Sequence, residues 1–343
     1  MKMRFFIVSG IASVMAVAPF ASGAQAKTTL LFNQYLPPSH FVQADILEPW
    51  ASDVEKATQG RVQVKFTASS LGPPQRQYDL VKGGVAQIAW GTQSYTPGRF
   101  LTSECVELPF LSRSAEALSV AYWRAYEAYL KQSREYDGVK LLALHVQTPG
   151  QLFSTKGPLK TLGDIEGLKI RQVNPATARL TEALGGVAVS ASIAKVYELL
   201  SRGVVDGTFL TADSVPKFNL TPYIRHEMTV SGGFYNTSFF VVMNQKVWDD
   251  LSPQDKAAID SVSGEALARR AGRVWDHETE AAQQLLDKEG IQRTQLEGEQ
   301  LEKLKSMLSG AERDWVGAMQ KAGLDGTSVL QMIRQEVEDY DTN

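Results

Sequence analysis

The sequence predicts an α/β fold with a largely parallel sheet, divided between two domains. From residue 27 onward, short β-rich runs alternate with amphipathic helical stretches, which is the pattern of such folds. The 317 residues that follow the first 26 exceed the usual size of a single hydrophobic core. No low-complexity linker separates the two halves, so we expect crossing strands to join the domains as a hinge.

The first 26 residues have the features of a secretory signal peptide. Lys2 and Arg4 supply the positive end, residues 5–18 are apolar, and Ala24-Gln25-Ala26 is a small-x-small cleavage site. The alternative is a retained membrane anchor, but this apolar run is shorter than the roughly 20 residues that span a bilayer. We therefore expect cleavage after Ala26 and export of a soluble mature chain.

In the first half of the mature chain, segments with the apolar spacing of a helix alternate with segments that have the spacing of a strand. Apolar residues recur every three or four positions over residues 44–57, which predicts a helix, and Gly60 suits its left-handed C-cap. Residues 61–67 alternate apolar and polar side chains, as a strand does. Two more strands are predicted, at residues 88–90 and 139–146.

The second half of the chain has the same alternation of predicted strands and helices. Asn174 and Pro175 form an N-cap and first turn, which predicts a helix that ends near Leu184 before two glycines. A further helix is expected at 193–202. Strands are predicted at residues 168–171, 187–189, 204–210 and 238–243, the last of them apolar on both faces and therefore inside a sheet.

Helices dominate the C-terminal part. Ser252 and Pro253 cap an amphipathic pattern of about nine turns that reaches Leu285, and the last 50 or so residues are helical and charged. We assign residues 27–149 and about 236–275 to the first domain, and residues 150–235 and about 276–343 to the second.

Charge and motifs exclude several classes of function. The chain has 35 basic and 38 acidic residues, and loss of Lys2 and Arg4 leaves 33 against 38, a net charge of −5 that argues against nucleic acid as a partner. No metalloprotease, nucleophile-elbow, phosphate-loop or dinucleotide-binding motif is present, so we expect no cofactor. The four histidines lack metal-ligand spacing, which predicts no metal site. Cys105 is the single cysteine and cannot form an internal disulfide; its apolar neighbours suggest a buried thiol.

Arg171 is the first candidate for ligand contact. It ends an apolar strand, and open α/β sheets bind ligands beyond their strand ends. A guanidinium group can donate two parallel hydrogen bonds to a carboxylate, although a surface ion pair explains the same position equally well. Aromatic residues at other strand ends could wall a pocket or fill the core: Tyr35, Trp90, Tyr95, Phe234 and Tyr235.

Several segments, in a specific order and spacing, carry a family resemblance. They are Ser39-His40, residues 55–62, Ser70-Leu71-Gly72, residues 167–171, 174–177, 196–198 and 203–207, and Trp248 with Leu251. With these segments the chain resembles the DctP-type solute-binding proteins of tripartite ATP-independent periplasmic (TRAP) transporters, over nearly all of the mature sequence.

This resemblance implies a two-domain type II periplasmic-binding fold with hinge strands, a long helix spanning both domains, and no catalysis. It implies a periplasmic protein that captures a small organic acid and delivers it to a permease with a small and a large membrane subunit. In the family, an arginine at the position of Arg171 pairs with the ligand carboxylate. Asn174, in the segment 174–177 that carries part of the resemblance, is also expected to contact the ligand.

Two departures from the family pattern concern specificity. Gln151 stands where many relatives with acidic sugar or dicarboxylate ligands have a second arginine, and Thr208, Phe209 and Leu210 replace polar residues beside Asp206. A second anionic group would have no partner at these positions, and an unpaired buried charge is costly. We therefore expect a monocarboxylate with an apolar or aromatic body, contacted by Gln151 and by Thr208 or Phe209.

Three other readings stay open. A receptor linked to an ABC transporter or a sensor would share the fold and differ only in its partner. A periplasmic enzyme would need a nucleophile, a base and an orienting group that the motifs do not supply. A structural envelope protein would show no response to small acids.

Overall fold

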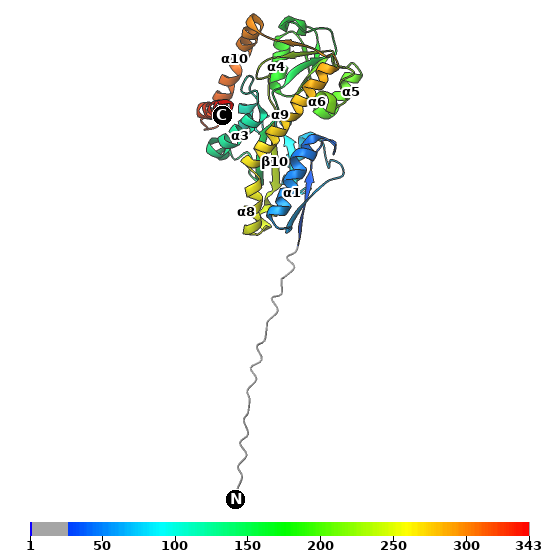
Figure 1. The fold of residues 1–343 in the computed structure, drawn as a ribbon. Coiled ribbons are helices and arrows are strands. Elements are labelled where there is room, and N and C mark those ends of the chain that lie inside the picture. Colours follow the sequence, from blue (N-terminus) through cyan, green and yellow to red (C-terminus); the bar gives the residue numbers. More distant parts are fainter. Residues whose placement is uncertain (2–26, 343) are drawn as a thin grey trace.

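The computed structural model describes residue 1 and residues 27–342, so the predicted signal peptide lies outside the described residues. The chain forms two β-sheets, each with helices packed around it (Figure 1). None of the helices in the described part is long and apolar enough to cross a membrane.

The first sheet has the strand order β2-β1-β3-β10-β4, and β10 alone runs antiparallel to its neighbours. Side chains of β10 alternate between two hydrophobic clusters: Phe239 and Val241 enter one, Phe240 and Val242 the other. This confirms that the apolar run lies inside a sheet. The strands are β1 (Thr28–Asn33), β2 (Val62–Phe66), β3 (Ile88–Thr92), β4 (Val139–Val146) and β10 (Ser238–Asn244).

The helices beside this sheet follow from local signals. Ser114 accepts a hydrogen bond from Ala117 N at 3.1 Å and caps α3, whereas Gly60 is left-handed, with a φ of 79°, but lies two residues beyond Thr58, the C-cap of α1. The helices are α1 (Glu48–Ala57), α2 (Gln77–Lys82), α3 (Ala115–Ala125), α7 (Gln245–Asp250) and α8 (Pro253–Val262), with the short turns η1 (Val42–Leu47), η2 (Pro74–Arg76), η3 (Gln93–Tyr95), η4 (Leu101–Val106), η5 (Tyr126–Leu130) and η6 (Lys131–Ser133).

The second sheet has the order β11-β9-β5-β8-β6-β7, and here β5 is the strand that runs antiparallel to both neighbours. Its strands are β5 (Gln151–Ser154), β6 (Lys169–Gln172), β7 (Val187–Ser190), β8 (Gly207–Leu210), β9 (His226–Thr229) and β11 (Gln292–Gln295). Its helices and turns are α4 (Pro175–Ala183), α5 (Val196–Ser201), α6 (Ser214–Lys217), η7 (Leu162–Ile165) and η8 (Ile193–Lys195).

Two segments cross between the sheets, at residues 147–150 and 230–237, as the sequence predicted. They pair with each other: Gly150 N donates to Tyr235 O at 2.9 Å, and Phe234 N donates to Gly150 O at 2.9 Å. Gln147 N donates to Thr237 O at 3.2 Å. The hinge is therefore a short, hydrogen-bonded pair of strands.

The predicted nine-turn helix after Ser252 is wrong in one respect, because it is broken between α8 and α9 (Glu265–Lys288). Gly264 takes a φ of 57° at the break and donates its N–H to Leu142 O at 2.7 Å, so a contact with β4 replaces a helical bond. α9 nevertheless reaches both sheets (Figure 1): Leu267 packs in a core of the first sheet and Leu286 in a core of the second.

The C-terminal helices also contact both parts of the molecule. In α10 (Gly298–Lys321), Leu304 joins the core of the second sheet, whereas Trp315 joins that of the first. α11 (Gly326–Thr342) packs against α3 and places Leu330 and Ile333 in the core of the first sheet. The domain boundaries given above stay a prediction.

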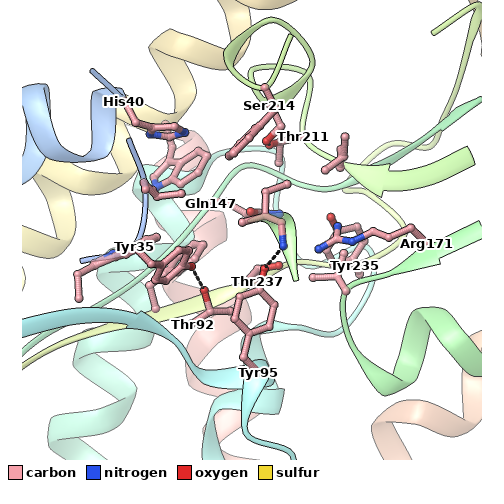
Figure 2. Close-up of a pocket in the computed structure, with 18 residues that line it drawn as sticks. Tyr35, His40, Thr92, Tyr95, Gln147, Arg171, Thr211, Ser214, Tyr235 and Thr237 are labelled. Carbon is pink, nitrogen blue, oxygen red and sulfur yellow. Dashed lines mark hydrogen bonds between the residues drawn. The ribbon is translucent and has the colours of Figure 1, made fainter. Parts of the chain in front are cut away.

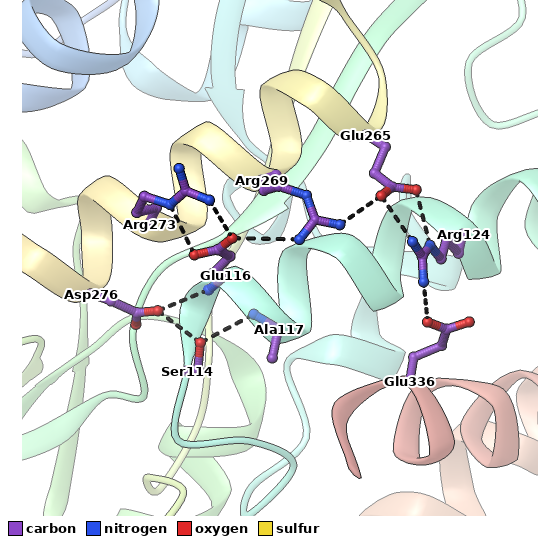
Figure 3. Close-up of polar contacts among 9 residues, drawn as sticks. All are labelled: Ser114, Glu116, Ala117, Arg124, Glu265, Arg269, Arg273, Asp276 and Glu336. Atoms are coloured by element: carbon purple, nitrogen blue, oxygen red, sulfur yellow. Dashed lines mark hydrogen bonds and ion pairs between the residues drawn. The ribbon is translucent and has the colours of Figure 1, made fainter. Parts of the chain in front are cut away.

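Polar contacts fix α9 against α3 (Figure 3). At the N-terminus of α3, Asp276 of α9 accepts a hydrogen bond from Glu116 N at 3.0 Å, which Figure 3 shows, and another from Ala115 N at 2.7 Å. Glu116 pairs in turn with Arg273 at 2.9 Å. At the other end of α3, Arg124 bridges Glu265 of α9 and Glu336 of α11. These pairs hold the two helices in one register.

Candidate functional site

A pocket lies between the two sheets, beside the hinge strands (Figure 2). It holds about 440 Å³ of empty space, including its opening to solvent. Both sheets contribute side chains to it, and most of these are aromatic or aliphatic. The lining residues are Tyr35, Leu36, His40, Trp90, Thr92, Tyr95, Gln147, Arg171, Val173, Ile193, Leu210, Thr211, Ser214, Phe218, Tyr235, Thr237, Phe239 and Trp275.

Arg171 of β6 supplies the charge of this pocket, and its side chain points inward (Figure 2). The residue is only 1% exposed. Nε donates to Ala191 O at 2.8 Å and Nη1 to Phe209 O at 3.2 Å, whereas Nη2 has no hydrogen-bond partner among the described residues. Its two partners are neutral carbonyl groups, so the guanidinium presents an uncompensated positive charge and a free donor to any anion in the pocket.

Aromatic rings packed against one another form the wall contributed by the first sheet. The ring of Trp90 lies 5.1 Å from that of Tyr35 and 4.8 Å from that of Phe239, centroid to centroid. The indole N–H of Trp90 donates to His145 Nε2 at 2.9 Å behind the wall. These contacts fix the ring planes, so the wall is a preformed apolar surface.

Several hydroxyl groups lie among the apolar side chains of the lining. The Tyr35 hydroxyl and Thr92 Oγ1 are 2.5 Å apart (Figure 2), and Tyr95 Oη accepts from Ile193 N at 2.9 Å. The second bond joins the two halves of the molecule across the pocket. Thr237 Oγ1 is buried and makes no hydrogen bond to the described residues, so it is free to bond to a ligand.

Burial keeps the hydroxyl groups of Tyr35 and Tyr235 neutral. It raises the pKa of Tyr35 and of Tyr235 well above the normal value of 10.0, although the charge of Arg171 acts in the opposite direction on both. Neither of these two hydroxyl groups therefore supplies a negative charge that would neutralise Arg171.

The structure brings five of the ten predicted site residues into this pocket: Arg171, Tyr35, Trp90, Tyr95 and Tyr235. Phe209 and Phe234 pack in the core beside the second sheet, and Thr208 is buried within β8. Asn174 caps α4 by accepting from Thr177 N at 2.9 Å. Gln151 bonds the backbone of Val230, at 3.0 and 3.2 Å.

Residues that were not predicted as ligand contacts complete the lining. Thr92 and Leu210 lie at strand ends, and Thr92 could have been found because it follows Trp90 by two positions and so shares its face of β3. Ser214, Phe218 and Trp275 come from helices and loops that no strand-end argument reaches. The lining residues not predicted are Leu36, His40, Thr92, Gln147, Val173, Ile193, Leu210, Thr211, Ser214, Phe218, Thr237, Phe239 and Trp275.

The position of Gln151 leads to a first testable expectation. Its side chain holds the hinge segment at Val230 and does not line the pocket, so we expect Gln151→Ala to change affinity for a carboxylate ligand by less than about threefold. The unfolding free energy should fall by about 1 kcal/mol, since two hydrogen bonds are lost. Calorimetric titration and urea denaturation measure both; a large loss of affinity with unchanged stability would place Gln151 in the binding site.

Glu107 gives the hinge region a pH dependence. Burial raises its pKa from 4.5 to about 7, while Ser238 Oγ and Asn174 Nδ2 donate to it at 2.6 and 3.3 Å. When the pKa of a carboxyl group is higher in the folded state than in the unfolded state, the group stabilises the folded state fully at pH values below its unfolded-state pKa. This stabilisation is lost as the pH rises through the folded-state pKa. As the pH rises from about 4.5 to 7, the protein therefore loses the stability that Glu107 contributes.

We expect Glu107→Gln to be more stable than the unmodified protein at pH 8 by about 2 kcal/mol, with the difference shrinking toward zero near pH 4.5. Urea denaturation over this pH range measures it. The exposed Glu302→Gln is the matched control and should leave the pH profile unchanged. Parallel profiles for Glu107→Gln and the unmodified protein would contradict the assignment.

Known proteins match this chain over most of its length. Residues 32–315 match the family model DctP, described as bacterial extracellular solute-binding protein, family 7. The chain is 31% identical over 327 residues to the outer membrane transporter protein TsaT of Comamonas testosteroni, covering 95% of this chain and 96% of that protein.

Two similar solved structures contain bound acids. A TRAP periplasmic solute-binding protein from Bordetella bronchiseptica, with bound (R)- and (S)-mandelate, is 34% identical with a TM-score of 0.88, covering 91% of this chain and 99% of that one. A TRAP solute-binding protein from Rhodoferax ferrireducens, with copurified benzoate, is 28% identical with a TM-score of 0.85, covering 92% and 99%.

Proposed function

Since the chain belongs to family 7 of the bacterial extracellular solute-binding proteins, we propose that it captures an aromatic monocarboxylate in the periplasm. We further propose that it releases this acid to the small and large membrane subunits of a TRAP permease, after cleavage of the signal peptide at Ala26. The bound acid leaves chemically unchanged.

The observation that carries the proposal is the state of Arg171. A guanidinium that is 1% exposed, with Nη2 unpaired and neutral carbonyl groups as its partners, leaves a charge without a counter-ion. A carboxylate would supply the missing acceptor and the missing negative charge together. Trp90, which stacks on Phe239 and has Tyr35 tilted against it, offers an apolar surface for a ring beside it.

The charge of the lining favours one carboxylate over two. Besides Arg171, the lining has one ionisable basic side chain, His40, and burial lowers its pKa to about 3, so it is neutral in the periplasm. A second carboxylate would be buried without a cation, which costs several kcal/mol. The ligands in the two similar structures, mandelate and benzoate, each have one carboxylate and one ring.

A thermal-shift panel tests this proposal. Benzoate and mandelate should raise the melting temperature, because a ligand at a hundredfold excess over its dissociation constant adds about 2.7 kcal/mol. Succinate and malate should have no comparable effect. Mass spectrometry of small molecules released on denaturation identifies any acid that copurifies, and recovery of added benzoate unchanged distinguishes binding from catalysis. Dicarboxylates that stabilise the protein more than every aromatic acid would overturn the ligand class.

Ligand capture also requires access to a buried pocket. The two sheets are joined by the short strand pair at the hinge, and Tyr95 and Ile193 bond across the pocket. We infer that this bond breaks when the two parts open, and that it re-forms over the bound acid.

A further inference from the structure

The end of the pocket far from Arg171 has polar groups of its own. Figure 2 shows His40 and Arg171 on opposite sides of the pocket. The ring of His40 lies 4.5 Å from that of Phe41, which in turn lies 4.7 Å from the ring of Trp275. Phe218, from the segment after α6, closes this end with its ring 5.7 Å from His40. A ligand held at Arg171 would direct the opposite end of its body here.

His40 is a hydrogen-bond donor at this end. Its Nδ1 accepts from Val42 N at 3.2 Å, and burial together with the charge of Lys217 lowers its pKa to about 3, so the ring is neutral. A neutral imidazole that accepts at Nδ1 has its proton on Nε2. The residue is only 4% exposed, and none of the described residues bonds to Nε2.

Trp275 contributes a second donor. Its indole ring is fixed by stacking on Phe239, at 5.8 Å with an interplanar angle of 7°, and by the edge contact with Phe41. The residue is 4% exposed, and Nε1 is buried without a hydrogen-bond partner in the described part of the chain. A buried N–H group without an acceptor destabilises the folded protein by about 1–3 kcal/mol, and a ligand that supplies an acceptor would remove this destabilisation.

The charge at this end selects the kind of acceptor. The neighbouring cation, Lys217, is already paired with Glu278 at 2.7 Å, and His40 is neutral. An anionic substituent would therefore lack a free partner, whereas an uncharged oxygen needs only the two N–H donors.

We propose that His40 and Trp275 recognise an uncharged oxygen acceptor on the ring of the bound acid, at the end opposite its carboxylate. This inference rests on the proposed function, because it requires an aromatic acid anchored at Arg171. It makes the two residues specificity-determining: they select ring-oxygenated aromatic acids over purely hydrocarbon ones.

Two nearly isosteric ligands test the inference. In 4-methoxybenzoate an ether oxygen replaces the inner CH₂ of 4-ethylbenzoate, so the acceptor is the main difference, and the 3-substituted pair covers the other ring position. At one of the two positions, calorimetric titration should show the methoxy acid bound about tenfold more tightly than the ethyl acid. Trp275→Phe, which retains a ring for stacking, and His40→Phe should each reduce this ratio of dissociation constants to about threefold or less.

The ratio within each variant is the readout, so a general change in affinity does not affect the conclusion. Phe218→Leu alters the same end without removing an N–H and is the matched control, in which the preference for the methoxy acid should persist. Equal binding of methoxy and ethyl acids by the unmodified protein at both ring positions, or a preference that survives in both variants, would overturn the inference alone. Failure of all four acids to bind would overturn the proposed function and this inference with it.

Discussion

Arg171→Met should abolish most of the binding of benzoate and mandelate while the protein still folds. The substitution removes the charge and the free Nη2 donor but leaves a side chain of similar length in the pocket. Loss of a buried, charge-assisted pair costs about 2–5 kcal/mol, which corresponds to a fall in affinity of roughly 30-fold to several thousand-fold. Calorimetric titration with benzoate measures the fall.

The stability of the ligand-free variant separates a binding role from a structural one. Arg171 pays a desolvation cost without a counter-ion, so its replacement by an apolar residue should lower the unfolding free energy by no more than about 1 kcal/mol. Arg171→Lys keeps the charge but loses the two-pronged donor, and should bind with intermediate affinity. Unchanged affinity in Arg171→Met would remove this residue from the site, and a collapse of stability would assign it to the fold.

Gly272→Ala should produce the largest loss of stability among small substitutions. A Cβ atom at this position of α9 would lie 2.4 Å from Glu116 Cα and 2.5 Å from Ala115 O. These are backbone atoms of α3, so one of the two helices must move, and the contacts around Asp276 move with it. We expect a loss of about 3 kcal/mol, from overpacking, measured by urea denaturation.

Gly317→Ala in α10 is the matched control. It makes the same change within a helix, but nothing lies within 4 Å of the added Cβ. Because alanine restricts the unfolded chain more than glycine does, this variant should be more stable by about 0.5–1 kcal/mol. Equal effects in the two variants would show that helix propensity, and not the close approach of α9 to α3, governs Gly272.

The elements that the sequence predicted well are those whose residues carry the signal themselves. β10 has apolar side chains on both of its faces, which is the pattern of a strand inside a sheet. Asn174 and Pro175 begin α4 where the sequence predicted a helix start. β11 could not be predicted, because its four residues, Gln292–Gln295, are polar or charged and the strand exists through its pairing with β9. The helix break at Gly264 likewise depends on a contact with Leu142.

The site was predictable where a residue's chemistry and its strand position agreed. Arg171 satisfied both conditions. Phe209 does not line the pocket, because side chains alternate between the two faces of a strand. Thr208 is in register with Arg171 on the neighbouring strand, so Thr208 and Leu210 lie on the same face of the sheet as Arg171. Phe209 therefore packs in the core on the opposite face. The donors at the far end, His40 and Trp275, lie 235 positions apart, and only the crossing of α9 past the hinge brings them together.

The position of β10 also determines when the first sheet can form as the chain folds. β10 pairs with β3 on one side and β4 on the other, so these two earlier strands have no contact in the sheet without it. All the residues from β4 to Thr237, which include most of the second sheet, must be synthesised before the first sheet can be completed. Pairing between such distant segments slows folding. A fragment ending at the first crossing would therefore expose two unpaired strand edges, those of β3 and β4 that β10 covers in the complete chain.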